Sequence, residues 1–310
     1  MVAATSVANH TTLTMPETTN LFYRLGLTGS PLSHSLSPKI HAAALETCGL
    51  HGEYSLFPIP PDDKQGLISL LARVRAGEIH GLNVTIPHKQ TVIGFLDKLT
   101  PAAQAIGAVN TIYLREGKLI GDNTDAPGFL SALNRFLSET QPQIENRKSK
   151  IVNRKSALVL GAGGSARAVV YALANDGWNV VIAARRIEQA RQLADTFPNH
   201  QLRTASFDLR PSTFDLQPST FNLIVNTTPL GMTPNIDQSP LPENLSLPSN
   251  VIIYDLVYNP SETKLVRSAR AQGLQAATGL GMLIEQAALS FEVWTGHNPP
   301  REALWNAVAN

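Results

Sequence analysis

A chain of 310 residues is too long for one small hydrophobic core and indicates about two domains. With 43% apolar residues, 16% charged residues and a net charge of +1, it has the composition of a globular protein and not that of a polyanion binder, so neither nucleic acid nor a membrane surface is an expected partner. The single cysteine, Cys48, excludes an internal disulfide and is interpreted as a packed thiol.

Residues 1–20 have neither the basic start nor the apolar stretch of a secretory signal, and no Lys or Arg precedes Arg24. We therefore expect a mobile tail and a cytoplasmic protein. No apolar run approaches the roughly 20 residues that a membrane-spanning helix requires.

From Leu21 onward, short apolar strands alternate with helical segments. This alternation predicts an α/β fold with a largely parallel sheet. The expected elements of the first part are a strand at 21–27, a helix at 38–48, a strand at 54–58, a helix at 64–76 and a strand at 81–86.

Two serines precede the first of these helices. Ser37 is suited to cap it, because Pro38 then falls in the first turn, where its missing N–H does no harm. Capping does not require Ser35. Two hydroxyls beside a helix N-terminus are a neutral, hydrogen-bonding seat for a carboxylate, which indicates a small anionic ligand.

Lys89 follows the strand at 81–86, and Pro87 predicts the start of a helix there. A lysine in the first turn of a helix is poorly placed for the helix dipole, so helix propensity does not explain it. The same dipole would make it easier for the ammonium to give up its proton, which suits an acid–base residue.

Asp125 precedes an amphipathic helix whose apolar face includes Phe129 and Leu133. It suits two roles equally: it caps this helix, or it accepts hydrogen bonds from Lys89 and from a substrate hydroxyl.

A buried strand at 156–160 runs directly into a glycine-rich turn and an apolar helix that ends at Gly177. This order is typical of a dinucleotide site. Gly161 permits the tight turn, Gly163 lets the backbone approach a pyrophosphate, and Ala166 lets helix and strand pack closely. Free N–H groups at the helix start would face the phosphates.

The next strand, at 179–183, is followed by Arg185 and Arg186 instead of the acidic residue that holds the ribose of NAD. Guanidinium groups attract the 2′-phosphate of NADP, so NADP is the expected cofactor.

Two seven-residue duplications occupy 146–159 and 211–224. They are far shorter than solenoid repeats and are interpreted as spare surface loop, the second copy of each running into a core strand.

Eight segments in order resemble the shikimate dehydrogenase family over about 21–310. They are GSPLSHSLSPKIH, GLNVTIPHK, GAVNTI, GDNTDAPGF, VLGAGGSARA, VNTTPLGM, YDLVYNP and GMLIEQAALSF. The resemblance implies an NADPH-dependent reduction of 3-dehydroshikimate, with Lys89 and Asp125 as the catalytic pair. It implies a substrate site formed by Ser35, Ser37, Thr85, Lys89, Asn110, Asp125, Tyr258 and Gln286.

For the cofactor, the resemblance adds Gly164 and Ser165 of the glycine turn, together with Asn226, Thr227, Met232, Val257 and Gly279. No metal is expected. The chain departs from the family where Asn-Arg-Thr usually follows the second strand of the cofactor domain. Here Ala184, Arg185 and Arg186 stand there, with Gln189 in place of a further arginine, and Arg186 supplies the second charge.

The implied architecture is a substrate domain of 21–124 and 279–310 and a Rossmann-type NADP-binding domain of 125–278, with a C-terminal helix returning to the first domain. A monomer or a homodimer is expected. Two rivals remain. An NAD-dependent quinate/shikimate dehydrogenase predicts an acidic residue near Ala184, and a non-catalytic shikimate-sensing protein predicts loss of Lys89 or Asp125.

Overall fold

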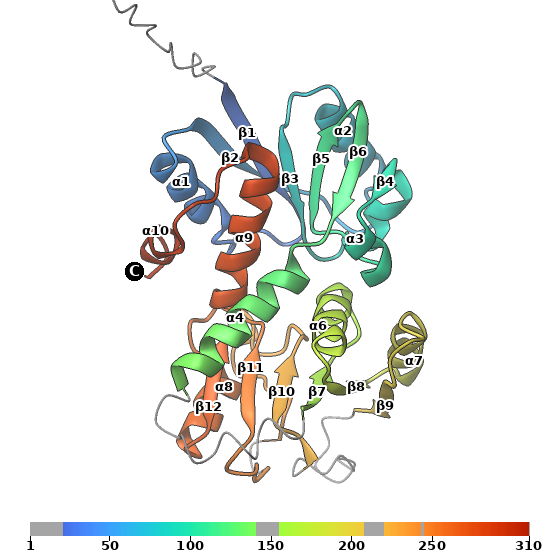
Figure 1. Cartoon of the computed structure of the whole chain (residues 1–310), viewed down its shortest axis with the longest axis vertical. Coiled ribbons are helices and arrows are strands. Elements are labelled where there is room, and N and C mark those ends of the chain that lie inside the picture. Colours follow the sequence, from blue (N-terminus) through green and yellow to red (C-terminus); the bar gives the residue numbers. More distant parts are fainter. Residues whose placement is uncertain (1–20, 141–154, 208–219, 243–244, 310) are drawn as a thin grey trace, which may run out of the picture.

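The computed structural model describes residues 21–140, 155–207, 220–242 and 245–309. Their strands form two six-stranded sheets, which lie one above the other in Figure 1. The tail predicted for 1–20 lies outside the described residues, as do the first copies of both duplications. The second copies do enter core strands, as predicted.

The first sheet has the strand order β2-β1-β3-β5-β6-β4. Its strands are β1 (Phe22–Gly29), β2 (His51–Pro58), β3 (Gly81–Val84), β4 (Lys98–Leu99), β5 (Thr111–Arg115) and β6 (Lys118–Asp122). The prediction of a largely parallel sheet is confirmed, and the exception is β5, which runs antiparallel to both β3 and β6. Glu116 and Gly117 join β5 to β6 with φ of 52° and 72°, the positive values that a two-residue hairpin turn requires.

The second sheet is parallel throughout, in the order β12-β11-β10-β7-β8-β9. Its strands are β7 (Ser156–Leu160), β8 (Asn179–Ala184), β9 (Arg203–Ser206), β10 (Leu223–Asn226), β11 (Ile252–Asp255) and β12 (Gln275–Thr278). This is the order of a Rossmann-type sheet, in which ligands bind at the carboxyl ends of the two strands where the order reverses. Here those strands are β7 and β10.

Helices cover both sheets, and the predicted helices near 38–48 and 64–76 are confirmed as α1 and α2. The helices are α1 (Ser37–Thr47), α2 (Lys64–Arg75), α3 (Pro101–Ile106), α4 (Asp125–Thr140), α6 (Gly164–Asn175), α7 (Ile187–Asp195), α8 (Lys264–Ala271), α9 (Leu280–Thr295) and α10 (Arg301–Asn306). In the described ranges, no helix combines the length and the apolar character needed to cross a membrane.

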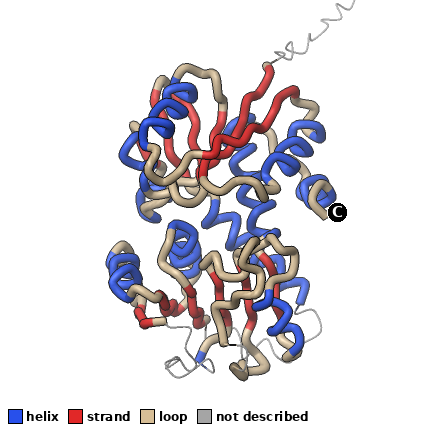
Figure 2. The backbone as a smooth tube through the Cα atoms, turned by 180° about the vertical axis from the view of Figure 1, so that it is seen from behind, coloured by secondary structure: helices blue, strands red, loops and turns tan. Residues whose placement is uncertain are grey.

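Helices α4 and α9 connect the two halves of the molecule (Figure 1), and the view from behind shows the same two-tier arrangement (Figure 2). Phe129 and Leu133 of α4 belong to the apolar core around the second sheet, whereas Ile284 and Phe291 of α9 belong to a core beside the first. The helices touch at Gly128, where an added Cβ would lie 2.8 Å from the backbone nitrogen of Gln286. Glycine therefore sets how closely they approach.

The core beside the first sheet contains an unusual buried group, His41 of α1. Its ring stacks on that of Tyr54 at 4.2 Å, and within the described residues neither ring nitrogen has a hydrogen-bond partner. Burial lowers the pKa of His41 from 6.5 to about 3. Cys48, which packs partly buried against the same core, has its pKa raised by burial, as suits a packed thiol.

His41 predicts a pH dependence of stability. The folded state holds the imidazole neutral while the unfolded chain protonates it below pH 6.5, so the contribution of His41 is complete above pH 6.5 and lost as pH falls toward 3. Between pH 7 and 5 this amounts to about 2 kcal/mol of unfolding free energy. Urea unfolding of a His41→Phe variant, which keeps a stacking ring, is expected to show a shallower acid slope than the parent. The same slope in both, with exposed His51→Phe as control, would contradict this.

Candidate active site

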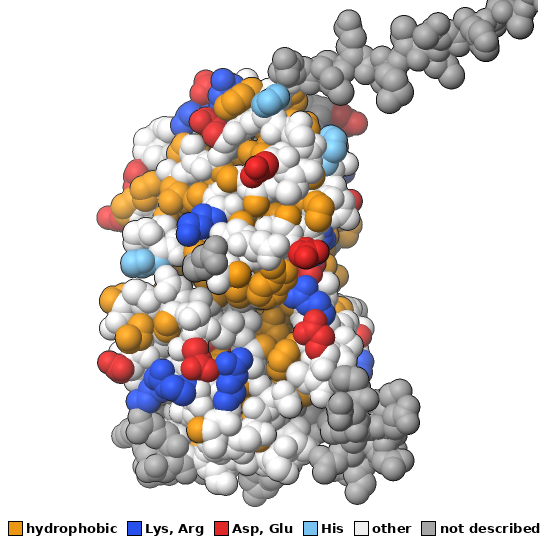
Figure 3. Space-filling model, turned by 90° about the vertical axis from the view of Figure 1, so that its left-hand side faces the viewer, with side chains coloured by type: hydrophobic (Ala, Val, Ile, Leu, Met, Phe, Trp, Pro, Cys, Tyr) orange, Lys and Arg blue, Asp and Glu red, His pale blue; other side chains and the backbone are white. Residues whose placement is uncertain are grey.

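A cavity of about 280 Å³ lies between the two halves, at the carboxyl ends of β1 and β3 above and of β7 and β10 below. On one face of the molecule, hydrophobic side chains gather at the same mid-height (Figure 3). Thirteen of the residues predicted for substrate or cofactor line the cavity: Ser35, Ser37, Thr85, Lys89, Asn110, Asp125, Ser165, Thr227, Met232, Val257, Tyr258, Gly279 and Gln286. The other predicted residues are Gly161, Gly163, Gly164, Ala166, Arg185, Arg186 and Asn226.

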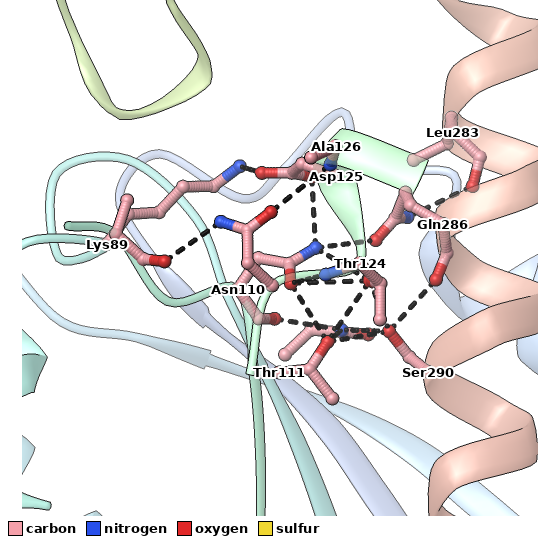
Figure 4. Close-up of polar contacts among 12 residues, drawn as sticks. Lys89, Asn110, Thr111, Thr124, Asp125, Ala126, Leu283, Gln286 and Ser290 are labelled. Atoms are coloured by element: carbon pink, nitrogen blue, oxygen red, sulfur yellow. Dashed lines mark hydrogen bonds and ion pairs between the residues drawn. The ribbon is translucent and has the colours of Figure 1, made fainter. Parts of the chain in front are cut away.

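The structure brings Lys89 and Asp125 together, although 36 positions separate them in sequence. The Lys89 Nζ lies 2.5 Å from Asp125 Oδ2, and both side chains are largely withdrawn from water, with exposed fractions of 13% and 5%. Figure 4 shows the ammonium pointing directly at the carboxylate. A buried ion pair needs further polar partners, because each charge has lost its hydration.

Asn110 supplies a further partner of Asp125. Its Nδ2 donates to Asp125 Oδ1 at 2.9 Å, and its Oδ1 accepts the backbone N–H of Thr124 at 2.8 Å. Since a backbone N–H only donates, it fixes which way the Asn110 amide faces. Both carboxylate oxygens of Asp125 therefore accept hydrogen bonds, and the acid is not the helix cap. Instead, the side chain of Asn123 accepts the N–H of Ala126.

The helix predicted to begin at Pro87 does not form there. Lys89 lies in a turn that precedes a short 3₁₀ helix, η1 (Thr91–Phe95), so the helix-dipole argument does not apply. The lysine is held by its surroundings instead. Its carbonyl accepts the N–H of Val109 at 2.7 Å, and Gly164 of the second half lies against its aliphatic stem, where an added Cβ would be 3.1 Å from Lys89 Cβ.

The two serines also differ from the prediction. Ser37 is the first residue of α1 and not its cap, and its N–H donates to the Ser35 Oγ at 3.2 Å. The N-cap position is held by Leu36, which has no capping side chain, and Ser35 accepts only the first N–H of the helix. Both serines line the cavity together with Tyr258. Burial raises the pKa of Tyr258, so its hydroxyl stays protonated at neutral pH and available as a donor.

Only part of the buried polar network beneath the cavity was predicted from the sequence. Gln286 accepts from Asn110 at 3.2 Å, and one turn further along α9 the Ser290 Oγ accepts from Asn83 at 3.0 Å. Thr111 and Thr124 also contact Ser290 (Figure 4). A signal existed in the sequence, since Ser290 is four residues after Gln286 on the same helix face. Its partners are too distant in sequence to be inferred from it.

The glycine turn has the geometry that a dinucleotide requires. Gly161 has a φ of 113°, and an added Cβ would lie 2.5 Å from Thr227 Oγ1, so only glycine fits. Gly163 is the N-cap of α6 and has open space beside it, whereas Ala166 is fully buried against the strands. Ser165 in the first turn of α6 lines the cavity, and the first N–H groups of a helix lack intrahelical partners, so an anion bound there would satisfy them.

Three other predicted cofactor residues do not line the cavity, because two of them lie at the surface and one is buried in the protein interior. Arg185 and Arg186 are exposed just beyond β8. Asn226 is completely buried at the end of β10, where it donates to Asp255 at 2.8 Å and accepts from Thr228. Asn226 therefore shapes the loop that follows β10, and Thr227 and Thr228 of that loop line the cavity.

Family models match three parts of the chain. A shikimate dehydrogenase substrate-binding domain matches 27–112, a shikimate/quinate 5-dehydrogenase model matches 143–213, and a shikimate 5′-dehydrogenase C-terminal domain matches 279–309. The shikimate dehydrogenase (NADP(+)) of Methanopyrus kandleri is 39% identical over 286 residues, covering 92% of this chain and 94% of that protein. The chain belongs to the shikimate dehydrogenase family.

Solved structures of family members have the same fold as this chain. The shikimate 5-dehydrogenase of Thermus thermophilus in complex with NADP(H) and shikimate is 39% identical, with a TM-score of 0.77 over 92% of this chain and 98% of that one. The quinate dehydrogenase of Corynebacterium glutamicum in complex with NAD is 29% identical, with a TM-score of 0.79 over 93% and 99%. Both shikimate and quinate enzymes thus share this fold.

Proposed function

We propose that this family member is a shikimate dehydrogenase that reduces 3-dehydroshikimate to shikimate with NADPH, as a step of aromatic amino acid biosynthesis. The observation that carries the proposal is the buried Lys89–Asp125 pair, because it faces the cavity where the carboxyl ends of both sheets meet. A ligand-sensing protein needs no such pair, whereas proton transfer to a ketone oxygen does.

In this mechanism, Ser35 and Ser37 hold the substrate carboxylate through their hydroxyls, with Tyr258 as a neighbouring donor. Thr85, Asn110 and Gln286 surround the ring hydroxyls and fix which face of the ring is presented. Lys89 donates a proton to the ketone oxygen as negative charge develops on it. Asp125 holds the ammonium in place until the transfer.

NADPH supplies the hydride when it is bound. The residues of the second half fit such a group: the glycine turn leaves the start of α6 open to a pyrophosphate, and Met232, Val257 and Gly279 line the cavity where a nicotinamide would reach the substrate. An added Cβ on Gly279 would lie 1.9 Å from the Leu256 carbonyl oxygen, so this position also requires glycine.

Arg185 and Arg186 are expected to determine the preference for NADPH over NADH. Replacing both by alanine is expected to raise the KM for NADPH by roughly 10–100-fold and to leave that for NADH nearly unchanged, because hydrogen bonds to charged groups contribute about 1.5–3 kcal/mol. Steady-state kinetics with both cofactors measure this, and Arg203→Ala on β9 is the matched control. An equal loss with NADH would show that the arginines do not recognise the 2′-phosphate.

We further propose that the two sheets correspond to the domains 21–124 with 279–310 and 125–278, which close over the ligands by bending near Asp125 and Gly279. Helices α4 and α9, which begin at these points and connect both cores, support this division. A cytoplasmic monomer or homodimer is the proposed form.

Absorbance at 340 nm with shikimate and NADP⁺ tests the proposed function in one assay. We expect NADPH formation with shikimate and little with quinate. Activity with quinate and NAD⁺ alone would favour the quinate dehydrogenase, whose fold is equally similar. Binding of shikimate without any turnover would favour a sensing protein.

A further inference from the structure

Arg167 has no place in the mechanism above, yet its side chain reaches from one half of the molecule to the other. It is the fourth residue of α6, directly after the glycine turn. Its Nη1 donates to the Ile106 carbonyl oxygen and to the Thr196 Oγ1, both at 3.3 Å. Ile106 ends α3 in the first half, and Thr196 is the C-cap of α7 in the second. In Figure 1, α3 lies directly above α6.

The helix ends beside the Arg167 guanidinium favour a positive charge. A cation in the first turn of a helix opposes the helix dipole, and it would also compete for any phosphate bound there. Arg167 instead turns its guanidinium toward the carboxyl ends of α3 and α7, which favour positive charge. The last carbonyl groups of a helix lack intrahelical partners, so the guanidinium also satisfies a group that the fold leaves open.

The contact with the first half leaves no spare room. Gly107 follows Ile106 with a φ of 67°, and an added Cβ there would lie 3.0 Å from Arg167 Nη1. The guanidinium therefore packs directly against the backbone of Ile106 and Gly107. Its Nε is buried and, in the part of the chain that the structure describes, has no partner. Since an unsatisfied buried donor is unfavourable, stability alone does not account for an arginine here.

The segment that Arg167 contacts also holds both members of the catalytic pair. Three residues beyond Ile106, the N–H of Val109 donates to the Lys89 carbonyl at 2.7 Å. The next residue, Asn110, donates its amide to Asp125 at 2.9 Å. Residues 106–110 are therefore a short connection from the dinucleotide turn, through Arg167, to Lys89 and Asp125.

We infer that Arg167 is a positioning residue that couples occupation of the dinucleotide turn to the arrangement of Lys89 and Asp125. A dinucleotide that orders the first turn of α6 fixes the guanidinium, and this fixes the segment 106–110 against the substrate. The two ligands then bind cooperatively. This inference rests on the proposed function, since it takes NADPH and shikimate as the ligands.

The test measures that coupling directly. NADPH and shikimate cannot react with each other, so the Kd of NADPH is obtained from its fluorescence with and without saturating shikimate, and the ratio is the coupling factor. Binding is reciprocal, so shikimate titrations with and without NADPH must give the same factor. We expect a factor of about fivefold or more for the parent protein, within the usual range for coupled sites.

Arg167→Met keeps an unbranched apolar stem and removes the guanidinium. We expect its coupling factor to fall to within about twofold of one, and its kcat to fall about tenfold or more because the pair is less well positioned. The Kd of NADPH alone should change little. Arg167→Lys, which keeps the charge but lacks the fork, should lose at least half of the parent's coupling and serves if Arg167→Met does not fold.

Arg191→Met is the matched control, because Arg191 lies on α7 and, among the described residues, forms its ion pair with Glu188 at the surface. It should keep the parent's coupling factor and kcat. Parental coupling in folded Arg167→Met or Arg167→Lys would overturn the inference, and so would a parent protein that binds both ligands and turns over but shows no coupling. A parent that binds neither ligand would overturn the proposed function instead.

Discussion

Lys89→Ala is expected to lower the turnover number for 3-dehydroshikimate by about 10²–10⁴-fold, the usual contribution of a general acid. The ammonium is the charged donor that Asp125 holds at 2.5 Å in the cavity, and alanine leaves the developing alkoxide without a proton source there. Affinity for NADPH should change little, because the side chain belongs to the substrate half. Initial rates and NADPH fluorescence titrations measure the two effects separately.

Lys98→Ala is the matched control, since it removes an exposed lysine from the same half of the molecule. Its turnover should equal that of the parent. A Lys89→Ala enzyme that retains more than about half of the parent's turnover would remove Lys89 from the chemistry.

Asp125→Asn is expected to lower the turnover number by about 10²-fold or more, although the new side chain has the same shape. The carboxylate accepts from Lys89 on one oxygen and from Asn110 on the other. An amide has only one acceptor atom, so its NH₂ group must face one of these two donors. Either orientation breaks a contact and displaces the ammonium from the position in which it meets the substrate.

The kcat at several pH values and a thermal unfolding curve measure this variant. A melting temperature equal to that of the parent would show that the loss of turnover does not result from unfolding. Asp97→Asn, which removes a surface carboxylate paired with Arg75, should retain the parent's turnover. Parental kcat in a folded Asp125→Asn protein would show that the ion pair has no part in catalysis.

Much of the second half could be predicted from the sequence because its pattern is local. The strand at 156–160, the glycine turn and the apolar helix are adjacent in sequence, so their order can be recognised without knowledge of the tertiary structure. The structure adds a long-range reason for Gly161, since Thr227, in the loop after the neighbouring strand β10, lies where a Cβ of residue 161 would be. The hairpin of β5 and β6 was not predicted, because its turn lacks the usual Asn-Gly or Asp-Gly signal.

The sequence by itself determined the α/β class and the strand, glycine turn and helix of the second half, and its family motifs predicted thirteen of the residues that line the cavity. Only the tertiary structure decided that Ser37 is the first residue of α1 and not its cap, that Lys89 lies in a turn, and that Asp125 pairs with it instead of capping α4. The physical reason is the separation in sequence between the residues that interact. Helix periodicity and turn chemistry depend on residues a few positions apart, whereas the hydrogen bond from Asn83 to Ser290 joins residues 207 positions apart and exists only because two sheets and their connecting helices pack around one cavity.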